Sequence, residues 1–262
     1  MKTVITFILL AVLFSCQSRN KYCVSEEDML YVKAKPSPSS NNFVYVNRFG
    51  SQRIPDPDKS KPEDEFVEAH EFSCGLALVR GYDKKWRYIN RKGETVIEAP
   101  YDKCWSFGEF YESDLGFKEL ARVNNGIKRY GGMGWNEGGK YGLIDTKGRV
   151  VLPVKYDEII NFDEEDRSRW MIKKDSVWGL IDDNANIIVS PQYDKLNYLG
   201  GNAFVEKNNK TGMLDKNGKV IIPLQYDSIF RISKDTIQVF KKGVPMLMNG
   251  RGKQIRKDFE SR

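Results

Sequence analysis

The sequence contains a single histidine, His70, among its 262 residues. A Ser-His-Asp or Cys-His catalytic arrangement would have to use that histidine, which lies in a charged connecting segment, Glu-Ala-His-Glu. We therefore predict an exposed loop histidine and not a catalytic one. Cysteine is also scarce, with four in the chain and no Cys-x-x-Cys pair, so the sequence does not support a metal site. No metal or other cofactor is expected.

The sequence also lacks an apolar run long enough to span a membrane. The apolar run of eleven residues at positions 4–14 would form a helix of roughly 17 Å, at about 1.5 Å per residue. A hydrocarbon core is about 30 Å thick, so this helix would not cross it. Together with the basic start, Met1-Lys2, the run predicts a secretory signal peptide over residues 1–15.

The residues that follow this run resemble a bacterial lipobox. Leu13-Phe14-Ser15-Cys16 fits a signal that is cleaved before the cysteine, with lipid then attached to Cys16. An ordinary signal peptide with a nearby cysteine is the alternative. By resemblance to lipoproteins in general, Gln17 implies sorting to the outer membrane of a Gram-negative cell. We expect a protein anchored in the cell envelope by lipid, facing the periplasm or the cell surface.

Clustered charge of one sign is absent too. The chain has 42 Lys and Arg against 36 Asp and Glu, and the two signs are interleaved along the sequence. A face that binds nucleic acid needs clustered basic residues, so we expect no nucleic-acid partner. Residues 16–42 are rich in Pro, Ser, Asn and charge, and they are predicted to form a tether.

An internal repeat dominates the remainder, residues 43–262. Its clearest copies read KYGLIDTKGRVVLPVKYDEI, VWGLIDDNANIIVSPQYDKL and KTGMLDKNGKVIIPLQYDSI. The Asp or Asn that opens each turn recurs at Asn47, Asn90, Asp145, Asp182 and Asp215, with a degraded copy at Met248. In four copies a Tyr-Asp pair begins eleven residues later. The inner spacing is fixed and the outer spacing varies, which predicts rigid units joined by loops of free length, with atypical end copies as caps.

Each copy is predicted to be a small β unit. Runs such as Gly-Leu-Ile-Asp and Val-Val-Leu-Pro favour strands and are too short for helices. The Asp-x-x-Gly between them is a turn signal, and a further apolar run precedes each hairpin. One such unit cannot bury its own aromatics, so neighbours must stack. We predict an all-β fold: a tandem array of about six β-hairpin or three-stranded meander units, either an open solenoid or propeller-like.

The string Trp178-Gly179-Leu180-Ile181-Asp182 and the Tyr-Asp pairs resemble the WG (KWG) β-repeat family of bacterial proteins, from about residue 44 to 255. The resemblance implies a fold and, loosely, a binding or scaffolding role, and it carries no catalytic motif. Thr211 departs from the aromatic at this position and suggests that its copy packs differently. Residues that recur at equivalent positions of the repeat are interpreted as structural: Trp86, Tyr101, Asp102, Tyr141, Gly142, Asp145, Tyr156, Asp157, Trp178, Gly179, Asp182, Tyr193, Asp194, Gly212, Asp215, Tyr226 and Asp227. We expect the Asp of each Tyr-Asp pair to accept backbone amide bonds at the turn after the third strand.

Three cysteines remain if Cys16 carries lipid. Cys74 and Cys104 flank one repeat, and an oxidising envelope would permit a disulfide between them. Two buried thiols that bracket a hairpin are the alternative. Cys23 lies in the predicted tether and would be left over.

The repeat is interrupted by a glycine-rich insertion at about residues 124–139. Its segment 134–140 matches the start of a phosphate-binding P-loop, but Tyr141 follows and the chain enters a predicted strand, so we treat the match as accidental. Tyr130, Met133 and Trp135 lie where the repeat does not require them. Loop aromatics on a rigid scaffold often bind sugars or partner chains. A hairpin tip whose Trp folds back on the sheet is the alternative.

Two functions follow from these features. The first is a non-catalytic envelope lipoprotein whose repeat array binds a partner protein or a glycan and is held to the membrane by its lipid anchor. The alternative is an enzyme acting on polysaccharide or peptidoglycan, with carboxylates such as Glu109, Glu112 or Glu137 as acid and base. We favour the first and expect no catalytic residues.

Overall fold

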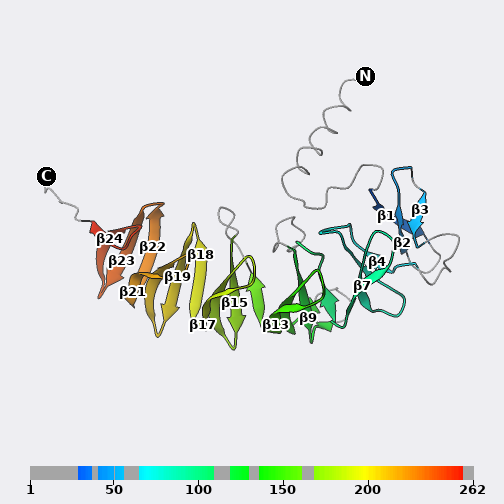
Figure 1. Ribbon diagram of the computed structural model, residues 1–262. Coiled ribbons are helices and arrows are strands. Elements are labelled where there is room, and N and C mark those ends of the chain that lie inside the picture. Colours follow the sequence, from blue (N-terminus) through cyan, green and yellow to red (C-terminus); the bar gives the residue numbers. More distant parts are fainter. Residues whose placement is uncertain are drawn as a thin grey trace, which may run out of the picture. The chain divides into compact units, whose positions relative to one another are not determined.

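The computed structural model describes residues 29–36, 41–49, 51–55, 65–108, 119–129, 136–160 and 168–255. The predicted signal peptide, Cys16 and Cys23 lie outside these residues. Every regular element that the model describes is a β-strand (Figure 1). A helix with the length and apolarity to span a membrane is absent from the described residues. The chain divides into two compact units, residues 1–125 with 144–150, and residues 126–143 with 151–262.

The first unit contains a three-stranded sheet, β1-β2-β3, and a four-stranded sheet, β4-β5-β6-β7. A further sheet has the order β13-β12-β9-β8 and draws residues from both units. The strands of these sheets are β1 (Tyr31–Pro36), β2 (Asn41–Val46), β3 (Gln52–Ile54), β4 (Glu68–Ala69), β5 (Ala77–Arg80), β6 (Trp86–Ile89), β7 (Thr95–Ala99), β8 (Lys103–Cys104), β9 (Leu120–Asn125), β12 (Lys140–Asp145) and β13 (Val150–Tyr156).

The second unit contains three more four-stranded sheets, each built from strands that follow one another in the sequence, and a two-stranded ribbon, β10-β11. Its strands are β10 (Lys128–Arg129), β11 (Asn136–Glu137), β14 (Glu158–Ile160), β15 (Arg169–Lys174), β16 (Val177–Asp182), β17 (Ile187–Tyr193), β18 (Lys195–Leu199), β19 (Asn202–Lys207), β20 (Lys210–Asp215), β21 (Val220–Tyr226), β22 (Ser228–Ser233), β23 (Thr236–Lys241), β24 (Val244–Asn249) and β25 (Gln254–Ile255). The predicted all-β tandem array is confirmed: six small antiparallel sheets follow one another along the described chain, besides the ribbon.

The repeating sheet has four strands, one more than the predicted meander. The extra strand begins directly after the Tyr-Asp pair and pairs with the first strand of the next copy: β14 with β15, β18 with β19 and β22 with β23. The sequence did not reveal this strand because it is short and varied, from two residues in β8 to six in β22. A sheet therefore takes its first strand from residues that follow the preceding copy.

Two kinds of turn alternate within each sheet. The turns Asp175-Ser176, Asn208-Asn209 and Lys242-Gly243 have both central residues at positive φ, as two-residue type I′ hairpins require. The Asp-x-x-Gly turns behave as predicted: Oδ1 of Asp215 accepts the amides of Asn217 and Lys219 at 2.8 and 2.9 Å. Asn249 accepts the corresponding amides of Arg251 and Lys253 in the last copy. The degraded anchor is therefore Asn249, and the assignment to Met248 was wrong by one residue, because Met248 points into the core.

A close approach of two strands explains the glycine of the Trp-Gly pair. A Cβ added to Gly179 would lie 2.4 Å from the carbonyl oxygen of Val189 and 2.7 Å from the nitrogen of Pro191. The ladder pairs Trp178 with Tyr193 and Leu180 with Val189, so three residues of β17 face one residue of β16. Proline, which has no amide hydrogen to donate, fits this irregularity.

The second copy tests this explanation, because it has Arg87 in place of the glycine. There the ladder runs regularly through Trp86–Ala99, Arg87–Glu98 and Tyr88–Ile97. Glu98 occupies the place of Pro153 and Pro223 in the third and fifth copies, where the fourth copy has Ser190 followed by Pro191. Arg87 Nε lies 3.5 Å from the Glu98 carboxylate. Glycine and proline are thus replaced together by an ion pair across a regular ladder.

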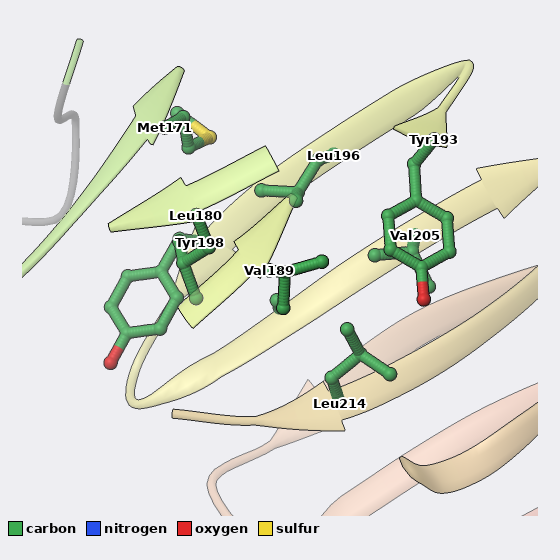
Figure 2. Packing of buried hydrophobic residues seen from close by; sticks show 9 residues of the cluster. Met171, Leu180, Val189, Tyr193, Leu196, Tyr198, Val205 and Leu214 are labelled. Atoms are coloured by element: carbon green, nitrogen blue, oxygen red, sulfur yellow. The ribbon is translucent and has the colours of Figure 1, made fainter. Parts of the chain in front are cut away.

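The core lies between successive sheets. In the second unit one cluster combines Met171, Leu180, Val189 and Tyr193 of the β14–β17 sheet with buried residues of the β18–β21 sheet (Figure 2). The residues contributed by the β18–β21 sheet are Leu196, Tyr198, Ala203, Val205 and Leu214. The other face of the β18–β21 sheet packs on the β22–β25 sheet through a second cluster that includes Met213 and Met248. The β18–β21 sheet is therefore buried by its neighbours on both faces, as a repeat array requires.

The two end sheets differ from the repeat. Gln238 of the last sheet pairs with Leu247, in the position that Phe204 and Met171 hold in the preceding sheets, so a polar residue replaces an apolar one on its outer face. At the other end β1 pairs with β2 from Tyr31–Val46 to Pro36–Asn41. The predicted tether at residues 16–42 is therefore wrong over residues 31–36, because Val32 packs on the core around Tyr45 and that packing fixes a strand.

Candidate functional site

The Asp residues of the Tyr-Asp pairs connect successive sheets. Oδ2 of Asp157 accepts the amide of Asp175 at 2.8 Å, and Asp194 accepts the amide of Asn208 at the same distance. Asp227 accepts the amide of Lys242 at 2.6 Å. The bonds go to backbone amides, as predicted, but the turn that receives them is the type I′ hairpin of the next sheet.

Lysine side chains reinforce two of these contacts. Lys210 Nζ lies 2.6 Å from Oδ1 of Asp227, and Lys140 makes the same contact with Asp157. The hydrogen bond from Lys210, followed by the amide of Lys242, holds the pKa of Asp227 below its ordinary value. Val177 occupies the position of these lysines in the intervening copy, so Asp194 has no such pair there. These carboxylates are committed to the fold.

The repeated aromatic residues are committed to the core. Tyr156, Tyr193 and Tyr226 are buried, and burial raises the pKa of the first two. Tyr101 is half-buried, and burial raises its pKa as well. Trp86 is buried and its indole N–H donates to the carbonyl of Asp102 at 3.2 Å.

The other copies keep the register at the Trp position with different side chains. Trp178 and Tyr141 are half-buried, and the ammonium of Lys173 lies 5.0 Å from the Trp178 ring centre. Thr211 pairs with Tyr226 as Trp178 pairs with Tyr193, and its hydroxyl donates to the Tyr226 carbonyl at 3.3 Å. The ladder of this copy therefore keeps the register of the others at the position where the aromatic is missing.

The remaining structural positions complete the turns and the close approaches. Asp145 and Asp182 accept turn amides as Asp215 does. Burial opposes the ionisation of Asp145, but bonds from the amide and guanidinium of Arg149 outweigh it and lower its pKa. Added Cβ atoms at Gly142 and Gly212 would each lie 2.7 Å from a carbonyl oxygen of the facing strand.

The interruption of the repeat is a β-ribbon. Lys128 pairs with Glu137 and Arg129 with Asn136, between the end of β9 and the start of β12. At its base an added Cβ on Gly126 would lie 3.3 Å from Cα of Gly139, a tight approach, and the φ of +87° at Gly126 favours glycine there. The insertion begins at Gly126 and not at 124, because Asn124 is a fully buried residue of β9. The chain enters β12 directly after the ribbon, which removes the P-loop interpretation of residues 134–140.

The predicted contact residues Tyr130, Met133 and Trp135 lie between β10 and β11 in the sequence, outside the described residues. Glu109 and Glu112 also lie outside the described residues, and of Glu137 only the backbone is described.

The ribbon accounts for only part of the long interval between the second and third copies. The amide of Asp102 donates to the carbonyl of Asn124, and the equivalent amide of Asp194 donates to the carbonyl of Glu206. More residues separate the first pair than the second, so the connection between β8 and β9 is longer than in the later copy. Both ends of β9 therefore lead into segments that the repeat does not require.

One feature of β9 was missed from the sequence. Arg122 is 2% exposed and its guanidinium carbon lies 4.1 Å from the Trp105 ring centre. The position is held by Leu78 in the preceding sheet and by Met171 and Phe204 in later ones. The signal was a basic residue at the centre of the apolar run ELARV. This copy therefore differs from the others in two ways: it has a buried arginine on β9, and non-repeated segments adjoin both ends of that strand.

Cys74 and Cys104 carry free thiols, so the disulfide that the sequence left open is not formed. Cys104 is buried on β8, and burial raises its pKa to about 12. Cys74 is half-buried in a turn at positive φ, where Ser73 Oγ lies 3.9 Å from its sulfur. Their separate environments suit two structural thiols.

His70 directly follows β4 and is half-buried, with its ring centre 6.4 Å from that of Trp86. Its carbonyl accepts the hydroxyl of Tyr45 at 2.6 Å. The prediction of a loop histidine exposed to solvent was wrong, because β4 joins this segment to the sheet. Among the described residues no three His, Cys, Asp or Glu are arranged to hold a metal ion.

Four segments match the model of the WG containing repeat: residues 86–109, 141–169, 178–210 and 212–244. This chain carries WG-containing repeats. Each matched segment begins within β6, β12, β16 or β20 and continues past the Tyr-Asp pair into the following sheet. The segments 178–210 and 212–244 end in the third strand of that sheet, β20 and β24. No curated protein matches the chain.

Solved structures similar to the WG-repeat chain include β-propellers. BamB from Moraxella catarrhalis is 12% identical, with 87% of this chain and 69% of that chain covered and a TM-score of 0.32. The WD40 β-propeller domain of Doa1 is 12% identical, with 87% and 77% covered and a TM-score of 0.27. A eukaryotic initiation factor is 11% identical, with 88% and 63% covered and a TM-score of 0.38. At these scores the likeness says nothing about ligand or partner.

Proposed function

We propose that this WG-repeat protein is a non-catalytic, lipid-anchored protein of the cell envelope that binds a partner protein or a glycan. The contact lies on the β10–β11 ribbon, through Tyr130, Met133 and Trp135. The observation that carries the proposal is that the repeated residues have structural contacts, whereas the ribbon does not belong to the repeat. The repeated aspartates accept hydrogen bonds from turn amides and link neighbouring sheets. The β10–β11 ribbon has no counterpart among the described residues of the other copies.

The ribbon suits recognition for physical reasons. Its base is fixed by a close glycine–glycine approach, and it projects from a copy that already departs from the repeat at Arg122. Aromatic side chains give large contact area at low entropic cost when a rigid scaffold presents them. An outer-membrane anchor at Cys16 would place the ribbon within reach of envelope proteins and glycans.

The binding proposal is tested with the full chain and its Trp135→Ala variant in a panel of envelope glycans and purified envelope proteins. We expect the variant to lose at least tenfold in affinity for the ligand that wild type selects, since a buried aromatic contact is typically worth more than about 1.4 kcal/mol. Phe49→Ala is the control, because Phe49 is an exposed aromatic in a turn outside the ribbon. Equal binding by wild type and Trp135→Ala would refute the ribbon as the contact site.

The anchor is tested separately by fractionation and fatty-acid labelling of cells that express wild type or Cys16→Ala. We expect wild type to carry label in the membrane fraction and the variant to carry none. A labelled Cys16→Ala protein would show that another residue is modified. An unlabelled wild type would leave an ordinary signal peptide as the explanation of the leader.

The enzyme hypothesis gains no support from the described residues. A general acid needs a raised carboxyl pKa, whereas the carboxyl shifts found at Asp83, Asp145, Asp175 and Asp227 are all downward. Peptidoglycan turnover abolished by Glu109→Gln or Glu112→Gln would restore that hypothesis over the binding one.

A further inference from the structure

The last two sheets have an uneven distribution of charge between their two ends. Three of the turns at one end carry basic residues: residues 215–219 between β20 and β21, 233–236 between β22 and β23, and 249–253 between β24 and β25. Five exposed basic side chains stand on or beside these turns, and we call them the cationic end: Lys216, Lys219, Lys234, Arg251 and Lys253. Only two acidic residues, Asp215 and Asp235, lie in the same turns.

Contacts between the sheets bring these turns together. A Cβ added to Gly252 would lie 2.2 Å from the carbonyl oxygen of Ile221, so the last turn rests on the strand that begins at Val220. A Cβ added to Gly200 would lie 1.9 Å from a guanidinium nitrogen of Arg231, which places a sixth basic group at this end. Adjacent packed sheets are about 10 Å apart, close to the Debye length at physiological salt, so the charges act on one ligand together.

At the opposite end of the same sheets, four lysines have a side-chain partner. Lys195 lies 3.1 Å from Glu206 and Lys210 lies 2.6 Å from Asp227. Lys207 and Lys241 donate to the amide oxygens of Gln192 and Gln225. Within the described part of the chain, no side chain of the cationic end makes such a contact. The asymmetry therefore distinguishes this end from an ordinary solvated surface of mixed charge.

The turn sequences themselves generate the excess. In the third copy Arg149 donates to its own turn carboxylate, Asp145, at 2.6 Å, so the charges cancel locally. Lys219 and Lys253 occupy the position of Arg149 in the last two copies. Asp215 uses Oδ1 for two backbone amides, and Asn249 replaces the aspartate altogether. The anchor needs only one oxygen acceptor, so the fold tolerates the loss of charge.

We propose that the cationic end is a binding surface for phosphate-bearing anions. Convergent, unpaired Lys and Arg side chains on fixed turns give an attractive field over several phosphates, and phosphate oxygens accept hydrogen bonds from such groups. The source of the phosphate is the headgroup layer of an anionic membrane. This surface goes beyond the function proposed above, because it requires neither the lipid on Cys16 nor the ribbon aromatics.

The test compares the full chain with the variant Lys216→Gln/Lys219→Gln/Lys253→Gln. Vesicles of phosphatidylglycerol, vesicles of phosphatidylcholine and inorganic polyphosphate are the three probes. Any binding through the leader is common to all variants, so the excess affinity for phosphatidylglycerol over phosphatidylcholine isolates the charges. We expect the variant to lose that excess by roughly tenfold to a hundredfold, since each basic residue near an anionic surface contributes about fivefold.

The matched control is Lys195→Gln/Lys207→Gln/Lys241→Gln, which removes the same charge from the opposite end, where these lysines have side-chain partners. We expect its binding to stay within about twofold of wild type, and raising the salt concentration to weaken wild type far more than the first variant. Equal losses in the two variants, or no preference of wild type for phosphatidylglycerol or polyphosphate, would overturn the proposal. Tighter binding to polyphosphate than to vesicles would keep the phosphate surface and assign it to a soluble polyanion.

Discussion

At the scale of the residue, the Trp-Gly glycine is explained by the backbone that crosses it. Gly179 has an ordinary φ, so its role is not conformational freedom but the absence of a side chain beneath Val189 and Pro191. In the second copy Arg87 stands in place of this glycine, and there the facing strand keeps a regular ladder through Glu98.

Gly179→Ala should therefore destabilise the protein by about 3 kcal/mol, the upper part of the range for forcing atoms into a packed site. Gly201→Ala is the matched comparison, because Gly201 has φ +79° but nothing within 4 Å of an added Cβ. That variant should lose only about 1 kcal/mol, the cost of a left-handed alanine. Denaturant unfolding of both variants measures the difference, and equal losses would contradict the close-approach explanation.

A second prediction at this scale concerns the turn anchors. Asp182→Ala removes the acceptor for the amides of Asn184 and Asn186. The loss of two backbone bonds in a partly exposed turn should cost about 1–2 kcal/mol. Asp182→Asn keeps an oxygen acceptor, as Asn90 and Asn249 do in their copies, and should be nearly neutral in the same thermal or denaturant measurement. Similar losses in both variants would mean that the anchor acts through its charge.

At the scale of the element, the contact between Asp227 and the next hairpin predicts a dependence on pH. The pKa of Asp227 is lowered in the folded protein, so the folded state prefers the ionised carboxylate. Its stabilisation is present above the pKa of the unfolded state and is lost as the pH falls through the lower, folded value. Asp227→Asn should therefore lower Tm at neutral pH and have little effect at a pH below the folded pKa.

Asp194→Asn is the control for this prediction, because Asp194 accepts the amide of Asn208 without a lysine partner. Its effect on Tm at neutral pH should be smaller than that of Asp227→Asn. Lys210→Met in a wild-type background should reproduce most of the effect of Asp227→Asn. If Tm falls equally for the two aspartates, the lysine contributes nothing to the contact.

At the scale of the whole molecule, burial of each sheet by its chain neighbours predicts local stability. Leu214 is 2% exposed between the β14–β17 and β18–β21 sheets, and Leu214→Ala should cost about 2–4 kcal/mol. Interactions in such an array reach nearest neighbours. Hydrogen exchange should therefore accelerate in these two sheets and change little in the β4–β7 sheet. Uniform acceleration in every sheet would indicate one cooperative unit.

The sequence by itself determined the all-β class, the number of copies and most of their turns. These depend on signals within a few residues: Asp182 and Asp215 open turns through bonds to amides two and four positions away, and Gly218 takes positive φ in the turn that Asp215 opens. Hydrogen bonds of this kind join residues close in the sequence and do not depend on the tertiary surroundings, so the repeat pattern predicted these turns.

Only the tertiary structure decided what depends on partners far along the chain. The fourth strand of each sheet, the hairpin that Asp157 contacts, the burial of Arg122 and the strand formed by residues 31–36 all require a neighbouring strand or sheet to be in place. The cationic end belongs to the same class, because its residues come from three turns that only the stacking of two sheets brings together. Local sequence determines each turn. Which side chains are buried, and which charges lie close together, depends on the strands and sheets that the fold packs beside them.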